Sequence, residues 1–587
     1  MGARCGLRER TRRQRRCTGR RVPHVARRRV RGVLLVAEVR SHRRCPRRIH
    51  RDVGDALSRA RTREHGRGRA RQRARGVGPG RATTARGCAS RIGQWSSGRS
   101  APSRCGRGRA HLPALARRSR GRVQTHLAGA AVTRYRPDSS WWRTRRRSTD
   151  GSANDTVVAG SPLRLFRLGP AGSKLADALE ATGDAPDGSQ QLVNRFVDAG
   201  AIHPIPDQAI DLAAVTVVIP ARNERHVDLQ MLVSSVSSAA KVIVVDDGSP
   251  LELAPIDGAL VVRREHSGGP AAARNTGAAL ADTDFVLFID ADTCWNDDAV
   301  VLFAHFTDSR VAAVAPRVRS IDGPSLLERY ETAESPLDLG PEAARVRPNS
   351  RVSYVPAAAL AVRRSTFEQL GGFDESFRYG EDVDFVWRAV AAGHVVRYEP
   401  LAEVQHRPRG SFEAWIRQRV GYGSAAASLA ARHRGAVTPL KINRWSAGAW
   451  ALTGWGRPDA GVLVATSSWA LLLRKLGDAP DRRGIALRLA GRGNLHAGRL
   501  VASAVTRAWL PIAIVLALFF PRARRALAVA LTVPSAVHWI STKPNVDLSR
   551  YVLLKALDDA SYCTGVWRGL VKSRASGRWG AITPRFD

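Results

Sequence analysis

The chain has 587 residues, enough for two or three domains with hydrophobic cores, and a formal net charge of +43. Residues 1–150 hold 44 arginines, no lysine and seven acidic residues, so this segment carries +37 of that charge. The remainder is nearly balanced, which excludes a basic, nucleic-acid-binding surface spread over the whole protein.

Residues 1–150 have a composition that opposes a packed core, because apolar periodicity is sparse and the arginines repel one another. Three interpretations compete: a disordered arm that binds RNA or anionic lipid, a targeting peptide, and wrong-frame translation of GC-rich DNA. No apolar run followed by a cleavage site supports the second. The excess of Arg, Gly, Ala and Pro without Lys favours the third, with a composition change near residues 149–155. Only Cys294 and Cys563 lie beyond the segment, which fits a reducing compartment.

Residues 152–206 are predicted to form a small domain. Residues 162–168 alternate as a strand does, and residues 171–181 and 190–199 have apolar side chains at helical spacing, ending at Gly200. A strand followed by two short helices suits a winged-helix-like unit. The segment resembles the PqqD-type domains that recognise peptides. A packing subdomain without a ligand is the alternative.

From residue 212 to residue 435 the pattern changes to short β-branched runs alternating with helical segments. The predicted strands cover residues 215–219, 241–245, 260–263 and 285–289. Such runs indicate an α/β domain with a mostly parallel sheet that is covered on both faces. Ligands of such sheets bind at the carboxyl ends of the strands, so the residues that follow each run are the candidates for function.

Polar residues follow the first two runs. Pro220 and Glu224 come after the first, and Asp246 and Asp247 come after the second. Two carboxylates at the end of a strand can accept hydrogen bonds from a nucleobase N–H and a ribose hydroxyl, although the same pattern is common in surface turns.

A glycine turn at residues 268–269 precedes a proline and a predicted helix that contains Arg274. A proline at the start of a helix is favourable, and the free N–H groups there attract anions. We therefore expect the N–H groups and Arg274 to point outward, toward nucleotide phosphates or a base.

Asp290 and Asp292 end the strand at residues 285–289 and are separated by one alanine. On an extended strand their side chains point to the same side, where two like charges are costly without a cation between them. Mg²⁺ or Mn²⁺ would remove this cost and could also bind diphosphate oxygens. His406, after a strand predicted at residues 395–398, is a third candidate ligand, with a structural hydrogen bond as the alternative.

Acidic residues also cluster at the start of a helix that opens near residue 381. Glu381, Asp382 and Asp384 lie where the helix dipole favours carboxylates. Asp384 and Arg388 are spaced for an ion pair on one helix face. Asp382 is better placed to act as a general base.

Residues 440–587 contain three apolar stretches, at residues 460–473, 500–520 and 526–540. Only the second approaches the roughly 20 residues that span a bilayer, and it includes Arg507 and Pro511. Buried helices, a hairpin on a membrane surface and short spans are all compatible with this pattern. A helical, partly apolar C-terminal region is therefore expected.

Residues 215–435 resemble the catalytic domain of the inverting family 2 glycosyltransferases, which has a Rossmann-like, GT-A-type fold. The resemblance rests on five motifs in family order, around residues 219–224, 246–249, 269–275, 290–292 and 372–382. It implies that Asp246 and Asp247 hold uridine, that Asp292 binds a metal with the help of Asp290, and that Asp382 deprotonates the acceptor. The Gln-X-X-Arg-Trp motif of processive members is absent. The residues expected around the nucleotide sugar are Pro220, Glu224, Asp246, Asp247, Arg274, Asp290, Glu381 and Arg419.

Residues 152–587 as a whole are similar to the glycosyltransferases of the mycofactocin system. This resemblance implies transfer of glucose from UDP-glucose to a peptide-derived redox cofactor precursor. The basic cluster at residues 522–525 favours a cytoplasmic turn, so we expect the protein at the cytoplasmic face of the cell membrane, and we expect no nucleic-acid partner. A family 2 enzyme that acts on a lipid or cell-surface glycan is one alternative. A nucleic-acid-binding protein that uses the Arg-rich segment is another.

Overall fold

The computed structural model describes residues 134–145, 155–205, 211–477 and 479–587. Residues 1–133 and 146–150 of the Arg-rich segment, to which the disordered-arm, targeting-peptide and wrong-frame interpretations apply, lie outside these ranges.

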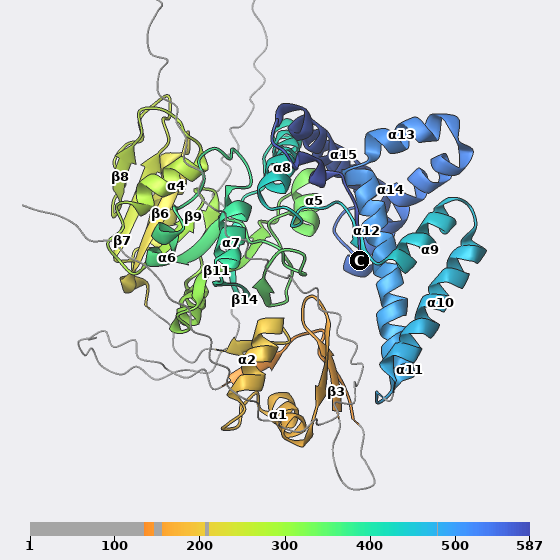
Figure 1. Cartoon of the computed structure of the whole chain (residues 1–587). Helices are drawn as coiled ribbons and strands as arrows, with labels where there is room; N and C mark the ends of the chain where they lie inside the picture. Colours follow the sequence, from red (N-terminus) through yellow and green to blue (C-terminus); the bar gives the residue numbers. More distant parts are fainter. Residues whose placement is uncertain (1–133, 146–154, 206–210, 478) are drawn as a thin grey trace, which may run out of the picture. The chain divides into compact units, whose positions relative to one another are not determined.

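The small domain begins earlier than the sequence predicts. Its strands are β1 (Arg134–Pro137), β2 (Trp142–Thr144), β3 (Asp155–Ala159), β4 (Arg164–Leu168) and β5 (Ile202–Ile205). Strand β1 pairs with β5, and β2 to β4 form an antiparallel sheet. Helices α1 (Pro170–Ala181) and α2 (Gln190–Ala199) form as predicted (Figure 1). The winged-helix-like and PqqD-type assignments stay predictions.

The boundary at residue 150 was therefore wrong, because β1 and β2 lie inside the Arg-rich segment. Arg143 of β2 forms ion pairs with Asp155, Asp177 and Glu180, which offset its charge. Tyr135 of β1 is buried in the core of the small domain. Paired charges and one buried ring allow an Arg-rich stretch to fold where composition alone argues against it.

The central domain is built on a nine-stranded sheet with strand order β10-β14-β11-β13-β9-β6-β7-β8, and β12 also pairs with β14. Strands β6 (Val215–Ala221), β7 (Lys241–Asp246), β8 (Leu260–Arg263) and β9 (Phe285–Ile289) are parallel, as predicted. The sheet as a whole is mixed, which corrects the expectation of a mostly parallel one. Strand β13 (Ala359–Arg363) runs antiparallel to both β9 and β11 (Val311–Ser320). The remaining strands are β10 (Thr293–Cys294), β12 (Ala344–Val346) and β14 (Val395–His406).

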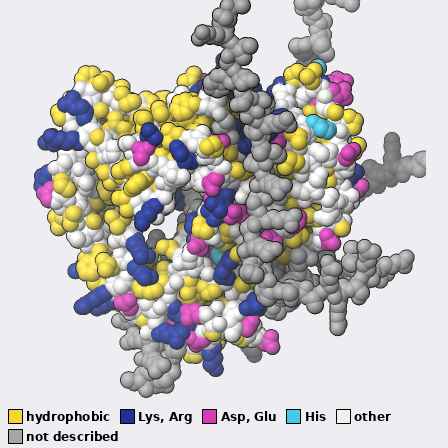
Figure 2. Space-filling model, turned by 180° about the vertical axis from the view of Figure 1, so that it is seen from behind, with side chains coloured by type: hydrophobic (Ala, Val, Ile, Leu, Met, Phe, Trp, Pro, Cys, Tyr) yellow, Lys and Arg dark blue, Asp and Glu magenta, His cyan; other side chains and the backbone are white. Residues whose placement is uncertain are grey.

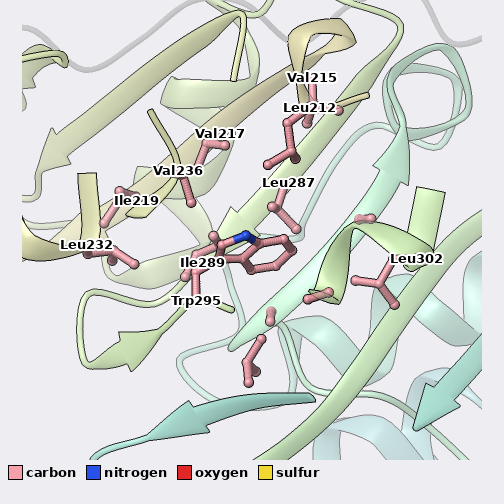
Figure 3. Close-up of a cluster of buried hydrophobic side chains, with 14 of the residues drawn as sticks. Leu212, Val215, Val217, Ile219, Leu232, Val236, Leu287, Ile289, Trp295 and Leu302 are labelled. Atoms are coloured by element: carbon pink, nitrogen blue, oxygen red, sulfur yellow. The ribbon is translucent and has the colours of Figure 1, made fainter. Parts of the chain in front are cut away.

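Both faces of this sheet are covered. Alternate residues of each strand point to opposite sides, so each strand contributes to two hydrophobic cores. Val217 and Ile219 of β6 face one core, together with residues of α3 (His226–Ser235) and a 3-10 helix at Asp297–Thr307 (Figure 3). Val218 faces the other core. That face is covered by α4 (Pro270–Ala278), α6 (Arg364–Gln369), α7 (Glu381–Ala391) and α8 (Phe412–Arg432).

Helix α8 packs against α15 (Leu548–Lys572) through glycines. A Cβ atom at Gly565 would lie 2.2 Å from the carbonyl oxygen of Val420, and one at Gly569 would lie 2.4 Å from that of Ser424. The two helix backbones can approach this closely only because these positions have no side chain. Helix α5 (Leu326–Glu334) contacts the same region through Tyr330.

The other C-terminal elements are β15 (Lys441–Ile442), α9 (Arg444–Gly454), α10 (Pro458–Leu476), α11 (Arg482–Ala486), a π-helix at Leu487–Arg492, α12 (Gly493–Arg507), α13 (Leu510–Phe519), α14 (Pro521–Thr542), a 3-10 helix at Arg578–Ala581 and β16 (Arg585–Phe586). In the described residues no single helix is long and apolar enough to cross a membrane. One bent pair, 482–507 with 510–519, has the length and composition but turns by 89°. Many apolar side chains are exposed over these helices, on the left of Figure 2.

Candidate active site

Asp246 ends strand β7 and is fully buried. Its carboxylate accepts hydrogen bonds from the N–H of Ser249 at 2.9 Å and of Leu253 at 3.4 Å, and from Arg263 at 2.6 Å. Burial opposes ionisation, but the hydrogen bonds from Ser249 and Leu253 and the charge of Arg263 lower the pKa of Asp246 below its usual value. Asp246 therefore holds the loop after β7 in place as an ionised anchor.

Asp247 binds the glycine turn directly. It accepts hydrogen bonds from the Ser267 hydroxyl at 2.7 Å and from the N–H groups of Gly268 and Gly269 at 2.9 and 2.8 Å, and Arg264 lies 3.0 Å away. The expectation that these N–H groups face outward for a phosphate was wrong, because Asp247 already accepts from them. Contact of Asp246 and Asp247 with a nucleoside stays a prediction.

Arg274 also departs from its expected place. Its side chain is 4% exposed and bridges two motifs, donating to Glu381 at 2.9 Å and to Asp290. The guanidinium also lies 5.7 Å from the centre of the Phe373 ring. Arg274 therefore does not project outward toward phosphates. It joins the Asp290 loop to the first turn of α7.

Asp382 lies in that first turn, half-buried. Its carboxylate accepts hydrogen bonds from the N–H of Ala357 at 3.2 Å and of Val383 at 2.7 Å. Burial raises its pKa, and the charge of Asp290 adds to this, whereas the two hydrogen bonds and Arg274 oppose it. Burial and the neighbouring charge of Asp382 raise the pKa of Glu381 to about 7. A fixed carboxylate with a raised pKa is suited to general-base catalysis.

The predicted ion pair between Asp384 and Arg388 is confirmed, with a nitrogen-to-oxygen distance of 2.7 Å. Asp384 is fully buried and also pairs with Arg432 at 2.9 Å and His433 at 2.7 Å. These contacts attach α7 to the end of α8, so Asp384 fixes the helix on which Asp382 lies.

Asp292 and His406 meet because β10 pairs with β14, with Thr293 opposite His406. The Nε2 atom of His406 lies 3.0 Å from Asp292 Oδ1, and Arg409 lies 3.3 Å from Oδ2. Burial disfavours the charged form of each side chain, but the attraction between the two charges outweighs it. The pKa of His406 is therefore raised and the pKa of Asp292 is lowered. Burial, together with the charge of Asp292, raises the pKa of Glu224.

Within the described residues, no group of three or more His, Cys, Asp or Glu side chains could hold a metal ion. Of the three predicted ligands, Asp292 and His406 lie together, whereas Asp290 faces Arg274. Two adjacent ligands of an octahedral ion at ~2.1 Å are separated by ~3 Å, which the 3.0 Å between Asp292 and His406 matches. Mg²⁺ commonly takes one or two protein ligands and completes its shell with substrate phosphates and water. The pair fits such a site, and metal binding stays a prediction.

Arg419 is not available to a nucleotide sugar, so this expectation was wrong. Its side chain is 2% exposed and forms ion pairs with Glu331 and with Asp558, the latter at 3.1 Å. It also lies over the Trp415 ring, at 5.3 Å. Arg419 therefore connects α8 with α5 and α15.

Pro220 lies in β6 opposite Val245 of β7, at the carboxyl end of both strands, as predicted.

Sequence reasoning missed two tyrosines close to Asp382, Tyr354 and Tyr422, whose pKa values are raised by burial and by the charge of Asp382. They come from separate segments, and their spacing in the sequence does not mark them.

Comparison with known proteins identifies the family. Residues 216–371 match the model of glycosyl transferase family 2. The chain is 40% identical over 460 residues to the pre-mycofactocin glycosyltransferase of Mycobacterium tuberculosis H37Rv, covering 74% of this chain and 95% of that one.

Two further similarities are more distant. The N-acetylglucosaminyl-diphospho-decaprenol L-rhamnosyltransferase of the same species is 34% identical over 143 residues, which covers 21% of this chain and 47% of that one. A mannosyltransferase from Pyrobaculum calidifontis, solved with GDP-Man and Mn²⁺, is 18% identical with a TM-score of 0.33, covering 67% of this chain and 99% of that one. On the 40% identity that extends over 95% of the Mycobacterium tuberculosis enzyme, and on the family model, the chain belongs to glycosyl transferase family 2, in the same family as the pre-mycofactocin glycosyltransferase.

Proposed function

We propose that the chain transfers glucose from UDP-glucose, with inversion, to a peptide-derived redox cofactor precursor in the mycofactocin pathway. The observation that carries the reaction type is Asp382, a carboxylate with a raised pKa held by two backbone N–H groups beside the Arg274–Asp290 pair. The similarity to the pre-mycofactocin glycosyltransferase, which extends over 95% of that protein, supports the acceptor class.

The reaction is a single displacement at the anomeric carbon. An acceptor hydroxyl oxygen forms the new bond to that carbon while the bond to the UDP oxygen breaks, and Asp382 accepts the hydroxyl proton. Arg274 keeps Asp290 and Glu381 at fixed positions, so the donor and acceptor sides of the site do not separate. Asp292 and His406 would hold Mg²⁺ or Mn²⁺, which would stabilise the negative charge of the departing diphosphate.

The test is the variant Asp382→Asn in the full chain, measured with UDP-glucose and a peptide-derived acceptor. We expect at least a hundredfold loss of turnover, because the amide cannot accept the proton, with UDP affinity retained. The matched control is Glu368→Gln on the exposed side of α6, whose ion pair with Arg364 contributes little. Transfer by Asp382→Asn at the wild-type rate would contradict the proposal.

A peripheral membrane position at the cytoplasmic face is a second part of the proposal. Helix α13 has no buried residue, and its exposed apolar side chains include Ile514, Leu518 and Phe519. It is followed by the exposed arginines Arg522, Arg524 and Arg525 at the start of α14. An apolar face next to a basic cluster complements an anionic lipid surface.

This position is tested by flotation with vesicles that contain phosphatidylglycerol. We expect the wild-type chain to float with them, and a variant with Leu518→Ser and Phe519→Ser to remain in the dense fraction. The matched control replaces two equally exposed leucines of the catalytic domain, Leu251→Ser and Leu401→Ser. The proposal would be contradicted if the variant with substitutions in α13 floated with the vesicles to the same extent as the wild type.

A further inference from the structure

Four tyrosines gather around Asp382. Tyr354 lies three residues before Ala357, whose N–H holds the carboxylate, and Tyr379 lies three residues before Asp382 itself. The Tyr379 and Tyr422 rings pack edge to face, with centres 6.1 Å apart. Tyr562 reaches the same region from α15, where its carbonyl oxygen touches α8 at Gly423. We refer to Tyr354, Tyr379, Tyr422 and Tyr562 as the tyrosine cluster.

The hydroxyl groups of the tyrosine cluster have no protein partners. Each of the four side chains is half-buried, yet within the described part of the chain none of their hydroxyls makes a hydrogen bond to another protein group. Other tyrosines differ: Tyr330 donates to Asp558 at 3.1 Å, and Tyr398 donates to the Gly340 carbonyl at 2.7 Å. None of the four hydroxyls is among the buried side-chain atoms without a partner, so all four are open to solvent and can hydrogen-bond a ligand beside Asp382.

Three arginines near the tyrosine cluster are paired with carboxylates. Arg419 pairs with two buried carboxylates, Arg409 lies 3.3 Å from Asp292, and Arg507 lies 2.9 Å from Asp559. The guanidinium of Arg507 also stacks 4.1 Å from the centre of the Tyr562 ring. These three guanidinium groups are therefore engaged with carboxylates, and the cluster itself offers ring faces and hydroxyls.

We propose that the tyrosine cluster is the acceptor-binding site and takes an uncharged, flat, hydroxyl-bearing ring, such as a phenol or a pyranose. The inference rests on the proposed function, because it takes Asp382 as the base. The ring stacks on Tyr422 and Tyr379 and its hydroxyls bond to the tyrosine hydroxyls, which leaves one hydroxyl facing Asp382. We expect an acceptor whose ring carries a diphosphate to bind this site more weakly than an uncharged ring.

The test is binding to the full chain without donor, by saturation-transfer NMR. The probes are phenol, phenyl β-glucoside and a polyprenyl-diphosphate-linked sugar. We expect both uncharged rings to bind the wild type, at least tenfold weaker binding to Tyr422→Leu, and a smaller loss in Tyr354→Phe, which keeps the ring. Tyr398→Phe, which removes a hydroxyl outside the cluster, is the matched control. UDP affinity, measured by calorimetry on each variant, detects loss of folding.

The inference would be overturned if the affinity for the ring probes in Tyr422→Leu and Tyr354→Phe stayed within twofold of the wild type. It would also be overturned if the wild type bound the polyprenyl diphosphate more tightly than the uncharged rings. If Tyr422→Leu does not fold, Tyr354→Phe and Tyr422→Phe still test the hydroxyls. Failure of the proposed function has a different signature, since the wild type would then bind neither UDP nor UDP-glucose while the ring probes could still bind the tyrosine cluster.

Discussion

Arg274 gives the sharpest test of the site, because it is the buried cation between two carboxylates. The variant Arg274→Met keeps most of the side-chain volume but leaves Asp290 and Glu381 without their partner. Removing one partner of a buried ion pair costs about 3–5 kcal/mol, since the remaining charge is buried without compensation. We expect a loss of unfolding free energy in this range at pH 8.

The loss should depend on pH, because the pKa of Glu381 is raised from 4.5 to about 7 in the folded chain. A carboxyl with a raised pKa reduces stability as the pH rises above its unfolded pKa, and the reduction stops growing above the folded pKa. Without Arg274 the folded pKa of Glu381 rises further, so the reduction continues to pH 8. Between pH 6 and pH 8 the difference between variant and wild type should grow by about 1.4 kcal/mol.

The assay is urea unfolding at pH 6 and pH 8, followed by tryptophan fluorescence. The control is Arg317→Met, which removes a partner of Asp338 in an ion pair that water reaches. Its effect should be smaller and the same at both pH values, because a partly solvent-exposed ion pair contributes little to stability. An equal loss for Arg274→Met at both pH values, or a loss below about 1 kcal/mol, would refute the role given to Arg274.

Three further predictions concern packing, catalysis and metal. Gly565→Leu should destabilise the chain by about 1–3 kcal/mol or more, because even the Cβ atom of the new side chain would collide with the Val420 carbonyl. Thermal unfolding measures this loss, and the control Gly454→Leu should show none, because no atom lies near a Cβ at that position. The rate of transfer should fall as the pH drops through the raised pKa of Asp382, because only the ionised carboxylate accepts a proton; a rate that stays constant down to the usual pKa of an aspartate would contradict this. Asp292→Ala should weaken Mn²⁺-dependent UDP binding at least tenfold in calorimetry, and an unchanged titration would exclude Asp292 as a ligand.

Local sequence patterns predicted the parallel strands and the helices of the small domain well. Strands β8 and β9 and helix α2 have the predicted bounds, because β-branched runs and a closing glycine are local signals. The direction of β13 was not predictable, since an apolar run does not indicate which way a strand runs. The Asp384–Arg388 pair was predictable because both residues lie on one helix face.

Side-chain partners distant in the chain could not be predicted. Arg274 has the spacing of a phosphate-binding residue, but Glu381, 107 positions later, takes its guanidinium inward. Arg419 has the spacing of a substrate contact, but Asp558, 139 positions later, holds it in the core. In both cases a buried cation requires a buried anion, and the sequence does not tell which acidic residue the fold brings to it.

The same long-range pairs set the extent of the functional unit. The family model ends at residue 371, before Asp382, and the matched region therefore includes the candidate donor side without the base. Asp382 is oriented by Ala357, and its helix is attached to α8 by Asp384. Helix α8 in turn contacts α15 through glycines and through Arg419 and Asp558. Because the orientation of the proposed base depends on this chain of contacts, we assign helix α15 to the same catalytic unit as α7 and α8, and we expect a membrane contact of the C-terminal helices to act close to the proposed acceptor side of the site.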